Sequence, residues 1–147
     1  MEIREAALND HLAQVLIALS EDWEAENISY GYGKNQYEDL VGNRIFLAEE
    51  NGGVIGYLLG HRVRAEKSDP IMQEGTEYFK VEELYVKPAC RSRGVGSALF
   101  RYVEALVRPE AAYLLLGTAT KNYRAILHFY IEELGMEFWS AALFKKL

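Results

Sequence analysis

Residues 86–99 constrain the fold of this chain more than any other stretch. They read Val-Lys-Pro-Ala-Cys-Arg-Ser-Arg-Gly-Val-Gly-Ser-Ala-Leu. β-Branched and aromatic residues lead into them from Tyr78, and Pro88 cannot donate to a sheet ladder, so a strand is predicted over 78–86. Apolar residues then recur at helical spacing from Val95 to Leu106, which predicts a helix of about four turns. The stretch is therefore a strand, a glycine loop and a helix entrance in succession.

This loop has the features of an anion-binding site. The first turn of a helix leaves backbone N–H groups unpaired at the positive end of the helix dipole, where phosphate oxygens bind readily. Gly94 and Gly96 have no Cβ, so the backbone can turn sharply and approach a ligand closely. Arg91 and Arg93 add positive charge beside these donors. We therefore expect the loop to hold a phosphate or pyrophosphate group.

Two common phosphate-binding loops fit this stretch poorly. A Walker loop has a lysine and then Ser or Thr after its last glycine, whereas Gly96 is followed here by Ser97 and Ala98. A dinucleotide fingerprint has a third small residue where Leu99 stands, and it usually opens a βαβ unit. A nucleotide-binding protein is therefore the weaker interpretation.

Length and charge bound the remaining possibilities. The 147 residues suffice for one domain with a core, so we expect a single domain over 1–147. The net charge of −6 disfavours general nucleic-acid binding and is compatible with a cationic substrate.

Cysteine, histidine and hydropathy patterns exclude several further classes. The single cysteine allows no internal disulfide, and no cysteine–histidine spacing suggests a metal site. No apolar run approaches membrane length, and a charged segment rather than an apolar leader follows Met1. We expect a cytoplasmic protein with no metal and no membrane partner.

Periodicity predicts the remaining elements. Asn9 or Asp10 is expected to cap a first helix whose leucines and valine repeat at i, i+3, i+4 and i+7. Asn51 and the two glycines after it favour a hairpin turn. The predicted order is β-α-α-β-β-β-α-β-α-β, a mixed α/β (α+β) fold with a mostly antiparallel sheet and helices on both faces. The strands are expected at 2–6, 45–49, 54–63, 78–86, 112–116 and, at the C-terminus, 136–139 and 141–146, with further helices near 36–41 and 121–133.

Two motifs resemble the GNAT superfamily of acyl-CoA-dependent N-acetyltransferases. Arg91-x-x-Gly94-x-Gly96 is similar to its acyl-CoA pyrophosphate loop. Asn122-x-x-Ala125-x-x-x-Phe129-Tyr130-x-x-x-Leu134-Gly135-Met136 resembles the segment after the fifth strand, with methionine where phenylalanine commonly follows the glycine. The predicted element order also matches this family, so the resemblance covers nearly the whole chain.

The resemblance implies acetyl-CoA as the acetyl donor and assigns residues to its parts. Backbone groups of the strand before the loop would meet the pantetheine arm and the developing oxyanion, and an asparagine and a tyrosine of the second motif would lie near the thiol end. The implied cofactor-binding residues are Leu84, Tyr85, Val86, Arg91, Ser92, Arg93, Gly94, Val95, Gly96, Ser97, Asn122 and Tyr130.

The chemistry requires two proton transfers. An alkyl amine has a pKa near 10.4, so only about one molecule in a few thousand is neutral at pH 7, and a base must take its proton. Glu82 and Glu83 lie on the strand before the loop, and strand alternation predicts that only one faces the cleft. Glu82 is the favoured base, directly or through water, because it resembles the acidic position of polyamine-type members. Tyr130 is a suitable general acid for the departing thiolate.

We therefore interpret the chain as an N-acetyltransferase acting directly on a primary amine. The acidic net charge and the carboxylates and aromatic rings of residues 21–37 favour a small cationic substrate. A catalytically silent acyl-CoA-binding or sensory module, and an enzyme that acetylates protein lysines or N-termini, are the alternatives. Strands 54–63 and the C-terminal strand are expected to allow pairing between chains, giving a homodimer.

Overall fold

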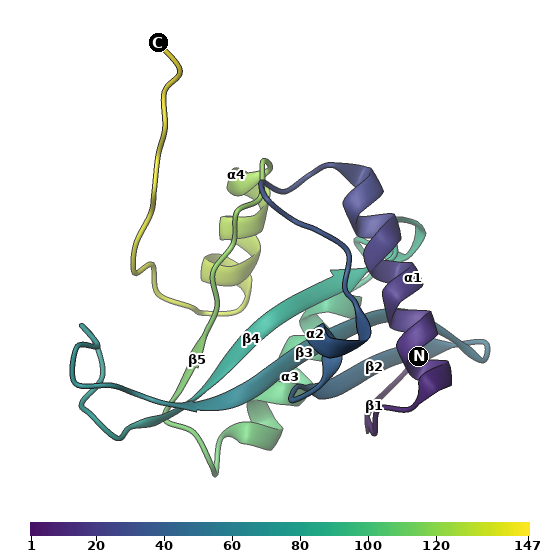
Figure 1. The fold of residues 1–147 in the computed structure, drawn as a ribbon, viewed down its shortest axis with the longest axis horizontal. Coiled ribbons are helices and arrows are strands. Elements are labelled where there is room, and N and C mark those ends of the chain that lie inside the picture. The colour runs from purple at the N-terminus through teal and green to yellow at the C-terminus, as the bar shows by residue number, and fades with distance from the viewer.

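A five-stranded sheet forms the centre of the molecule. The computed structural model describes all 147 residues. Its strands lie in the order β1-β2-β3-β4-β5, and the first four are antiparallel, whereas β5 runs parallel to β4 (Figure 1). The strands are β1 (Glu2–Ala6), β2 (Arg44–Glu50), β3 (Gly53–Arg64), β4 (Glu77–Val86) and β5 (Tyr113–Leu115).

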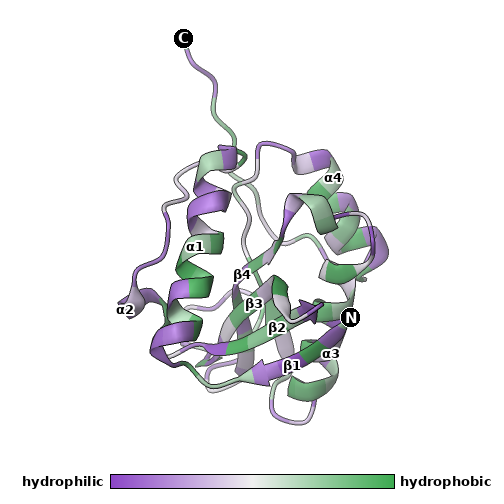
Figure 2. Cartoon of the chain, turned by 90° about the vertical axis from the view of Figure 1, so that its right-hand side faces the viewer, coloured by the Kyte–Doolittle hydropathy of each residue, from purple (hydrophilic) through white to green (hydrophobic).

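Helices cover both faces of this sheet, which confirms the predicted fold class. Helix α1 (Asp10–Glu26) begins at Asn9, whose side chain accepts a hydrogen bond from the Leu12 N–H at 2.8 Å. Its leucines pack with α2 (Tyr37–Leu40) on one face, and α3 (Val95–Val107) packs on the other. Figure 2 shows the hydrophobic sides of α1 and α3 turned towards the strands. The remaining helical segments are the 3₁₀ turn Pro88–Cys90, α4 (Tyr123–Leu127) and the π-helical turn His128–Glu133.

A β-bulge interrupts β4 at Glu82. Leu59 pairs with Glu83 and Gly60 pairs with Val81, so Glu82 has no partner on β3. The bulge reverses the alternation of side chains, because Val81 packs in the core under α3 whereas Tyr85 packs in the core under α1. The odd-numbered side chains at the two ends of this strand therefore pack on opposite faces of the sheet.

β4 and β5 separate towards one end of the sheet. Only Tyr78, Phe79 and Lys80 pair with β5, opposite Tyr113 to Leu115. The second half of β4 therefore has β3 on one side and no strand on the other. This open edge leads directly into the glycine loop and α3.

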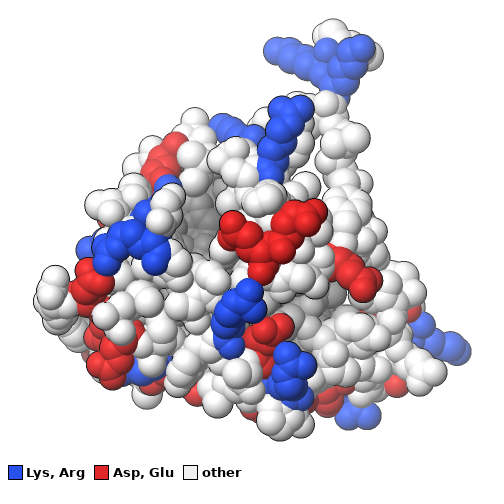
Figure 3. Space-filling model, turned by 180° about the vertical axis from the view of Figure 1, so that it is seen from behind, with Lys and Arg blue, Asp and Glu red and all other residues white.

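The C-terminal prediction is wrong. Residues 136–139 and 141–146 form no strand, and the chain leaves the body as an extended segment (Figures 1 and 3). A strand needs a neighbour for its backbone hydrogen bonds, and within one chain this segment has none. Leu143 is 95% exposed and Phe144 is 78% exposed, although Phe144 meets the edge of the Tyr30 ring at 5.6 Å between centroids. We call residues 136–147 the C-terminal segment.

The helical segments also test the predicted last helix and the expectation that no segment crosses a membrane. The helix predicted over 121–133 is divided into α4 and the π-helical turn, and Gly135 follows it with φ +75°. No helix in the structure combines the length and apolar character that a membrane crossing requires.

Candidate active site

The loop between β4 and α3 has the predicted geometry of an anion site. Gly94 precedes the first turn of α3 with φ +79°, and Ser92 also has positive φ, at +62°. No side chain caps this helix, so the N–H groups of Val95, Gly96 and Ser97 are left without an intrahelical acceptor. Three adjacent backbone donors at the positive end of a helix can bind phosphate oxygens.

The two arginines of the loop are held by carboxylates. Arg91 forms a two-armed ion pair with Glu26 at 2.6 and 2.9 Å, and its Nε donates to the Val86 carbonyl at 2.9 Å. Arg93 donates to both oxygens of Glu50 at 2.7 and 2.9 Å. Burial opposes ionisation of Glu26, but hydrogen bonds from Arg91 and Tyr85 bring its pKa below the ordinary value. The arginines therefore fasten the loop to α1 and β2, while the backbone supplies the free donors.

The strand leading into the loop carries the expected cofactor-contact residues. Leu84, Tyr85 and Val86 lie after the bulge, on the part of β4 that has no strand on the β5 side. The backbone groups on this side are open to a ligand, except that the Val86 carbonyl accepts from Arg91.

Glu83 is a partly buried carboxyl group that three donors hold in place. Its Oε1 accepts three hydrogen bonds, from the Tyr57 hydroxyl at 2.7 Å, the Asn35 amide at 2.9 Å and the Tyr32 hydroxyl at 3.3 Å. Its Oε2 has no partner. Burial raises the pKa of Glu83 and the charge of Asp39 raises it further, whereas the three donors lower it, and the net direction is upward.

Glu82 lies in a different environment. Its Oε1 contacts His61 Nε2 at 2.8 Å and Lys80 Nζ at 3.4 Å, and its side chain is 36% exposed. This carboxylate is paired with two basic groups at the surface. The residue favoured from the sequence and its neighbour are thus both present near the loop, with contrasting surroundings.

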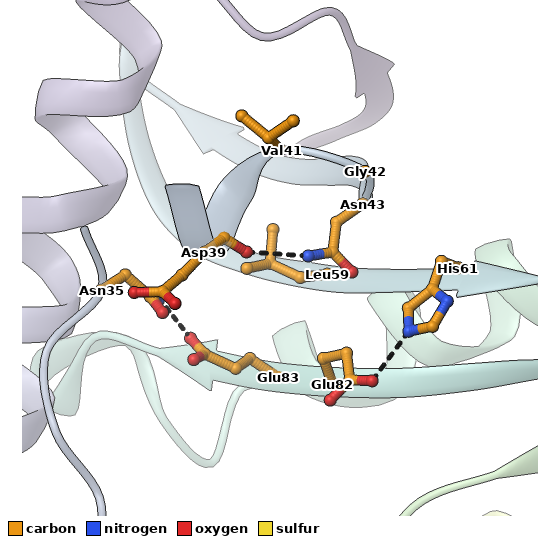
Figure 4. A pocket seen from close by; sticks show the side chains of 9 residues that line it. All are labelled: Asn35, Asp39, Val41, Gly42, Asn43, Leu59, His61, Glu82 and Glu83. Atoms are coloured by element: carbon orange, nitrogen blue, oxygen red, sulfur yellow. Dashed lines mark hydrogen bonds and ion pairs between the residues drawn. The ribbon is translucent and has the colours of Figure 1, made fainter. Parts of the chain in front are cut away.

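Both glutamates line one cavity of about 450 Å³ (Figure 4). Strand alternation predicted that only one could face the cleft, and this is wrong because the bulge at Glu82 breaks the alternation. Three carboxylates line the cavity and no lysine or arginine does. The lining residues are Asn35, Asp39, Val41, Gly42, Asn43, Leu59, His61, Glu82 and Glu83.

A stack of aromatic rings connects the loop to the cavity. Trp23 stacks on Tyr32 at 4.1 Å and on Tyr85 at 5.2 Å between ring centroids. The Arg91 guanidinium lies over the Tyr85 ring at 5.4 Å, and Tyr32 in turn donates to Glu83. The aromatic residues between positions 21 and 37 therefore include two that pack inward and position the carboxylate.

Tyr130 and Asn122 lie apart from this cavity. Tyr130, in the π-helical turn, packs against Phe100 and Phe129, with centroid distances of 6.3 and 5.1 Å. Burial raises its pKa to about 12. An ideal Cβ on Gly96 would lie 3.5 Å from the Phe129 ring, so the turn packs beside the first turn of α3. Asn122 precedes α4, and its exposed side chain caps nothing.

Sequence reasoning missed Tyr57, Asn35 and Asn43. Tyr57 lies within a predicted strand and resembles an ordinary core residue, and nothing in the local sequence places Asn35 beside Glu83 or Asn43 in the wall of the same cavity. Although three carboxylates and His61 line the cavity, no three His, Cys, Asp or Glu side chains in the molecule are grouped so that they could hold one metal ion.

The chain thus combines a sheet whose strands β4 and β5 separate, an uncapped helix start with free backbone donors, and an acidic cavity. Residues 9–136 match the sequence profile of the Acetyltransferase (GNAT) family, and the chain belongs to this family. The match confirms the resemblance of the two motifs. No curated protein matches the chain.

Solved structures share the fold. An aminoglycoside 6'-N-acetyltransferase from Acinetobacter haemolyticus superposes with a TM-score of 0.66 at 18% identity, covering 100% of this chain and 98% of that one. An aminoglycoside N-acetyltransferase in complex with CoA gives 0.67 at 18% identity, covering 99% and 98%. A ribosomal-protein-alanine N-acetyltransferase from Brucella melitensis biovar Abortus gives 0.64 at 16% identity, covering 99% and 100%.

Proposed function

We propose that this protein transfers an acetyl group from acetyl-CoA directly to a primary amine of a small cationic molecule. The observation that carries the proposal is Glu83, whose Oε1 is held by three donors while Oε2 has no partner. Oε2 is also open rather than enclosed, because the only fully buried side-chain oxygen or nitrogen without a partner is Asn43 Oδ1. A positioned carboxylate with one free oxygen, in a cavity of negative charge, suits an amine that must lose a proton.

The residues around the loop fit an acyl-CoA. The free N–H groups of Val95, Gly96 and Ser97 suit the pyrophosphate, and the open edge of β4 at Leu84 suits an extended chain that needs backbone partners. Acetyl-CoA, when bound, supplies the acetyl group as an activated thioester. Arg91 and Arg93 contribute by holding the loop in place, since their guanidinium groups are engaged by carboxylates.

Glu83 is the proposed general base. Its raised pKa brings it nearer the operating pH than an ordinary carboxyl, which favours proton transfer in the reaction. A carboxylate in its ionised form takes the proton from the substrate ammonium, directly or through one water. Glu82 is the competing assignment, but its oxygen is already engaged by His61 and Lys80.

Tyr130 is the proposed general acid. A group that gives a proton must hold it at the operating pH, and a pKa of about 12 keeps this phenol protonated. Its hydroxyl makes no hydrogen bond to another side chain, so it is free to donate. Tyr130 packs against Phe100 of α3, and its neighbour Phe129 packs beside the first turn of that helix.

The test is CoA release by the purified protein with acetyl-CoA. The panel comprises linear diamines, an aminoglycoside, amino acids and short peptides with a free lysine or N-terminal amine. Turnover on the small amines supports the proposal, and turnover on the peptides alone contradicts the substrate class. Binding of acetyl-CoA without turnover on any amine supports a silent acyl-CoA-binding module instead.

Two variants assign the residues. Glu83→Gln should lower kcat at least about a hundredfold, within the range typical for loss of a general base, while CoA affinity is retained. Glu82→Gln is the matched control, with the same chemical change one residue away. A larger loss of kcat in the Glu82 variant than in the Glu83 variant would assign the role of general base to Glu82. Tyr130→Phe should lower kcat and leave CoA affinity unchanged.

A further inference from the structure

The wall of the cavity opposite Glu83 carries a second set of oxygen atoms. In Figure 4, Glu82 and Glu83 approach from β4, whereas Asp39 and Asn43 approach from α2 and the turn after it. Asp39 Oδ2 accepts the Gln36 N–H at 2.8 Å as part of the α2 cap, and Oδ1 has no partner. The cavity therefore has acceptors at two ends that different elements supply.

Asn43 contributes an unusual atom to this wall. Its Nδ2 donates to the Asp39 carbonyl at 2.9 Å, which fixes the orientation of the amide. Its Oδ1 is fully buried and has no hydrogen-bond partner. An unpaired buried acceptor costs about 1–3 kcal/mol, so this wall holds a polar group at a cost to stability, and it fixes the Asp39 backbone through the Asn43 amide.

The charges of the cavity differ in how far they are neutralised. Glu82 contacts His61 and forms an ion pair with Lys80, whose positive charge offsets its own. Asp39 and Glu83 have no basic partner, and the charge of Asp39 opposes ionisation of Glu83. A cation that occupies the space between them would relieve this repulsion.

We propose that the cavity binds two positive charges of one substrate. The reacting amine lies at Glu83 Oε2, and a second ammonium lies at Asp39, to whose Oδ1 it donates a hydrogen bond. The inference rests on the proposed function and narrows its substrate class to amines with at least two cationic groups. Linear diamines and aminosugars share this chemistry, and about 450 Å³ lies within the range of small-molecule sites.

The experiment compares two amines that differ in one charge. 1,4-Diaminobutane and n-butylamine have the same carbon chain, and only the diamine carries a second ammonium. We expect kcat/KM for the diamine to exceed that for the monoamine by about tenfold or more, which corresponds to about 1.4 kcal/mol. An aminoglycoside in parallel distinguishes an aminosugar from a linear chain, and preferential use of either dication supports the inference.

The variant Asp39→Asn tests the second subsite. It removes the charge but keeps an oxygen that can accept the Gln36 N–H, so the α2 cap is retained. We expect it to lower the ratio of kcat/KM for the diamine to kcat/KM for n-butylamine about tenfold. The ratio is the readout because loss of the Asp39 charge also acts on Glu83, which serves both amines. Glu38→Gln is the control, because it removes the same charge from the neighbouring position of α2, which does not line the cavity.

The failures of the two proposals are distinguishable. Equal turnover of the diamine and the monoamine would overturn the second cation subsite and leave the acetyltransferase proposal intact. An equal loss in the Asp39 and Glu38 variants would also overturn it, because the effect would then reflect net charge alone. Absence of turnover with every amine would overturn the proposed function, and the subsite with it.

Discussion

Replacing Tyr57 by phenylalanine gives a direct test of how the structure tunes Glu83. Tyr57 is completely buried, and its hydroxyl donates to Glu83 Oε1 at 2.7 Å. The substitution keeps the ring and removes one of three donors to the carboxylate. A hydrogen bond to a charged group contributes about 1.5–3 kcal/mol, and one pKa unit corresponds to about 1.36 kcal/mol. Because the remaining donors and solvent recover part of the loss, we expect the pKa of Glu83 to rise by about one unit.

The direction of the effect on activity follows from the role of the base. Donors to Oε1 stabilise the ionised carboxylate, so removing one raises the pKa of a group that is already raised. The base acts in its ionised form. As the pH is lowered, the variant should therefore lose activity at a higher pH than the wild type does, so the acidic limb of its pH profile moves upward. The assay is kcat/KM as a function of pH with one amine for both proteins, so that titration of the substrate cancels.

Two tyrosine variants control this measurement. Tyr32→Phe removes the longer, 3.3 Å hydrogen bond to the same oxygen and should shift the acidic limb less. Tyr85→Phe removes a hydroxyl that donates to Glu26 instead and should leave the limb in place. An acidic limb that stays fixed in Tyr57→Phe, or moves to lower pH, would refute the assignment of Glu83 as the titrating base.

Further predictions concern stability, the cofactor loop, the acid and assembly. The pKa of Glu83 is raised in the folded state, so near neutral pH its ionised form costs stability that Glu83→Gln recovers. We expect an unfolding temperature about 2–4 °C higher in calorimetry, and a lower one would contradict the raised pKa. At Gly94, where φ is +79° and a Cβ would meet no atom, valine should weaken CoA binding at least about tenfold by calorimetry and asparagine far less. Equal losses would refute the conformational argument. Tyr130, with a pKa of about 12, should cause no alkaline loss of kcat until pH approaches that value, and an earlier loss abolished by Tyr130→Phe would contradict its protonation state. The exposed C-terminal segment predicts a homodimer in sedimentation experiments, which Leu143→Asp with Phe144→Asp should convert to monomer, and a monomeric wild type would contradict the role of this segment.

Local signals in the sequence predicted the parts of the molecule that depend on local geometry. Gly94 has the positive φ that the loop requires, and Asn9 caps α1 through its side chain, as the pattern indicated. These features depend on the backbone within one turn, which neighbouring residues determine. The glycine loop could be assigned to anion binding for the same reason.

The surroundings of Glu83 could not be predicted in this way. Its partners Tyr57, Asn35 and Tyr32 are 26, 48 and 51 positions away along the chain, and tertiary packing alone brings them to one oxygen. The bulge at Glu82 could not be predicted from the sequence either, because its effect on alternation depends on the register with β3. The arginines were assigned by charge, and their carboxylate partners come from α1 and β2.

The C-terminal segment was predicted as a strand, and no strand forms. Its aromatic and other apolar residues are typical of a strand, yet a strand forms only where an edge is available to pair with it. Within one chain, the short β5 ends after three residues and the segment departs from the body. The residue pattern therefore indicates that the segment can form a strand, but the strand forms only when another strand is available to pair with it.

The bulge in β4 separates the two faces of this strand from the numbering of its residues. Before it, the odd-numbered Phe79 and Val81 face α3, and after it the odd-numbered Glu83 and Tyr85 face α1. Deleting Glu82 would make Val81 and Glu83 consecutive residues that still pair with Gly60 and Leu59. Regular alternation would then keep Val81 under α3 and Glu83 under α1, so both layers would retain their side chains. Glu82 is therefore an extra residue of the strand, and its deletion should cost the cavity one carboxylate without moving the core side chains to the wrong layer.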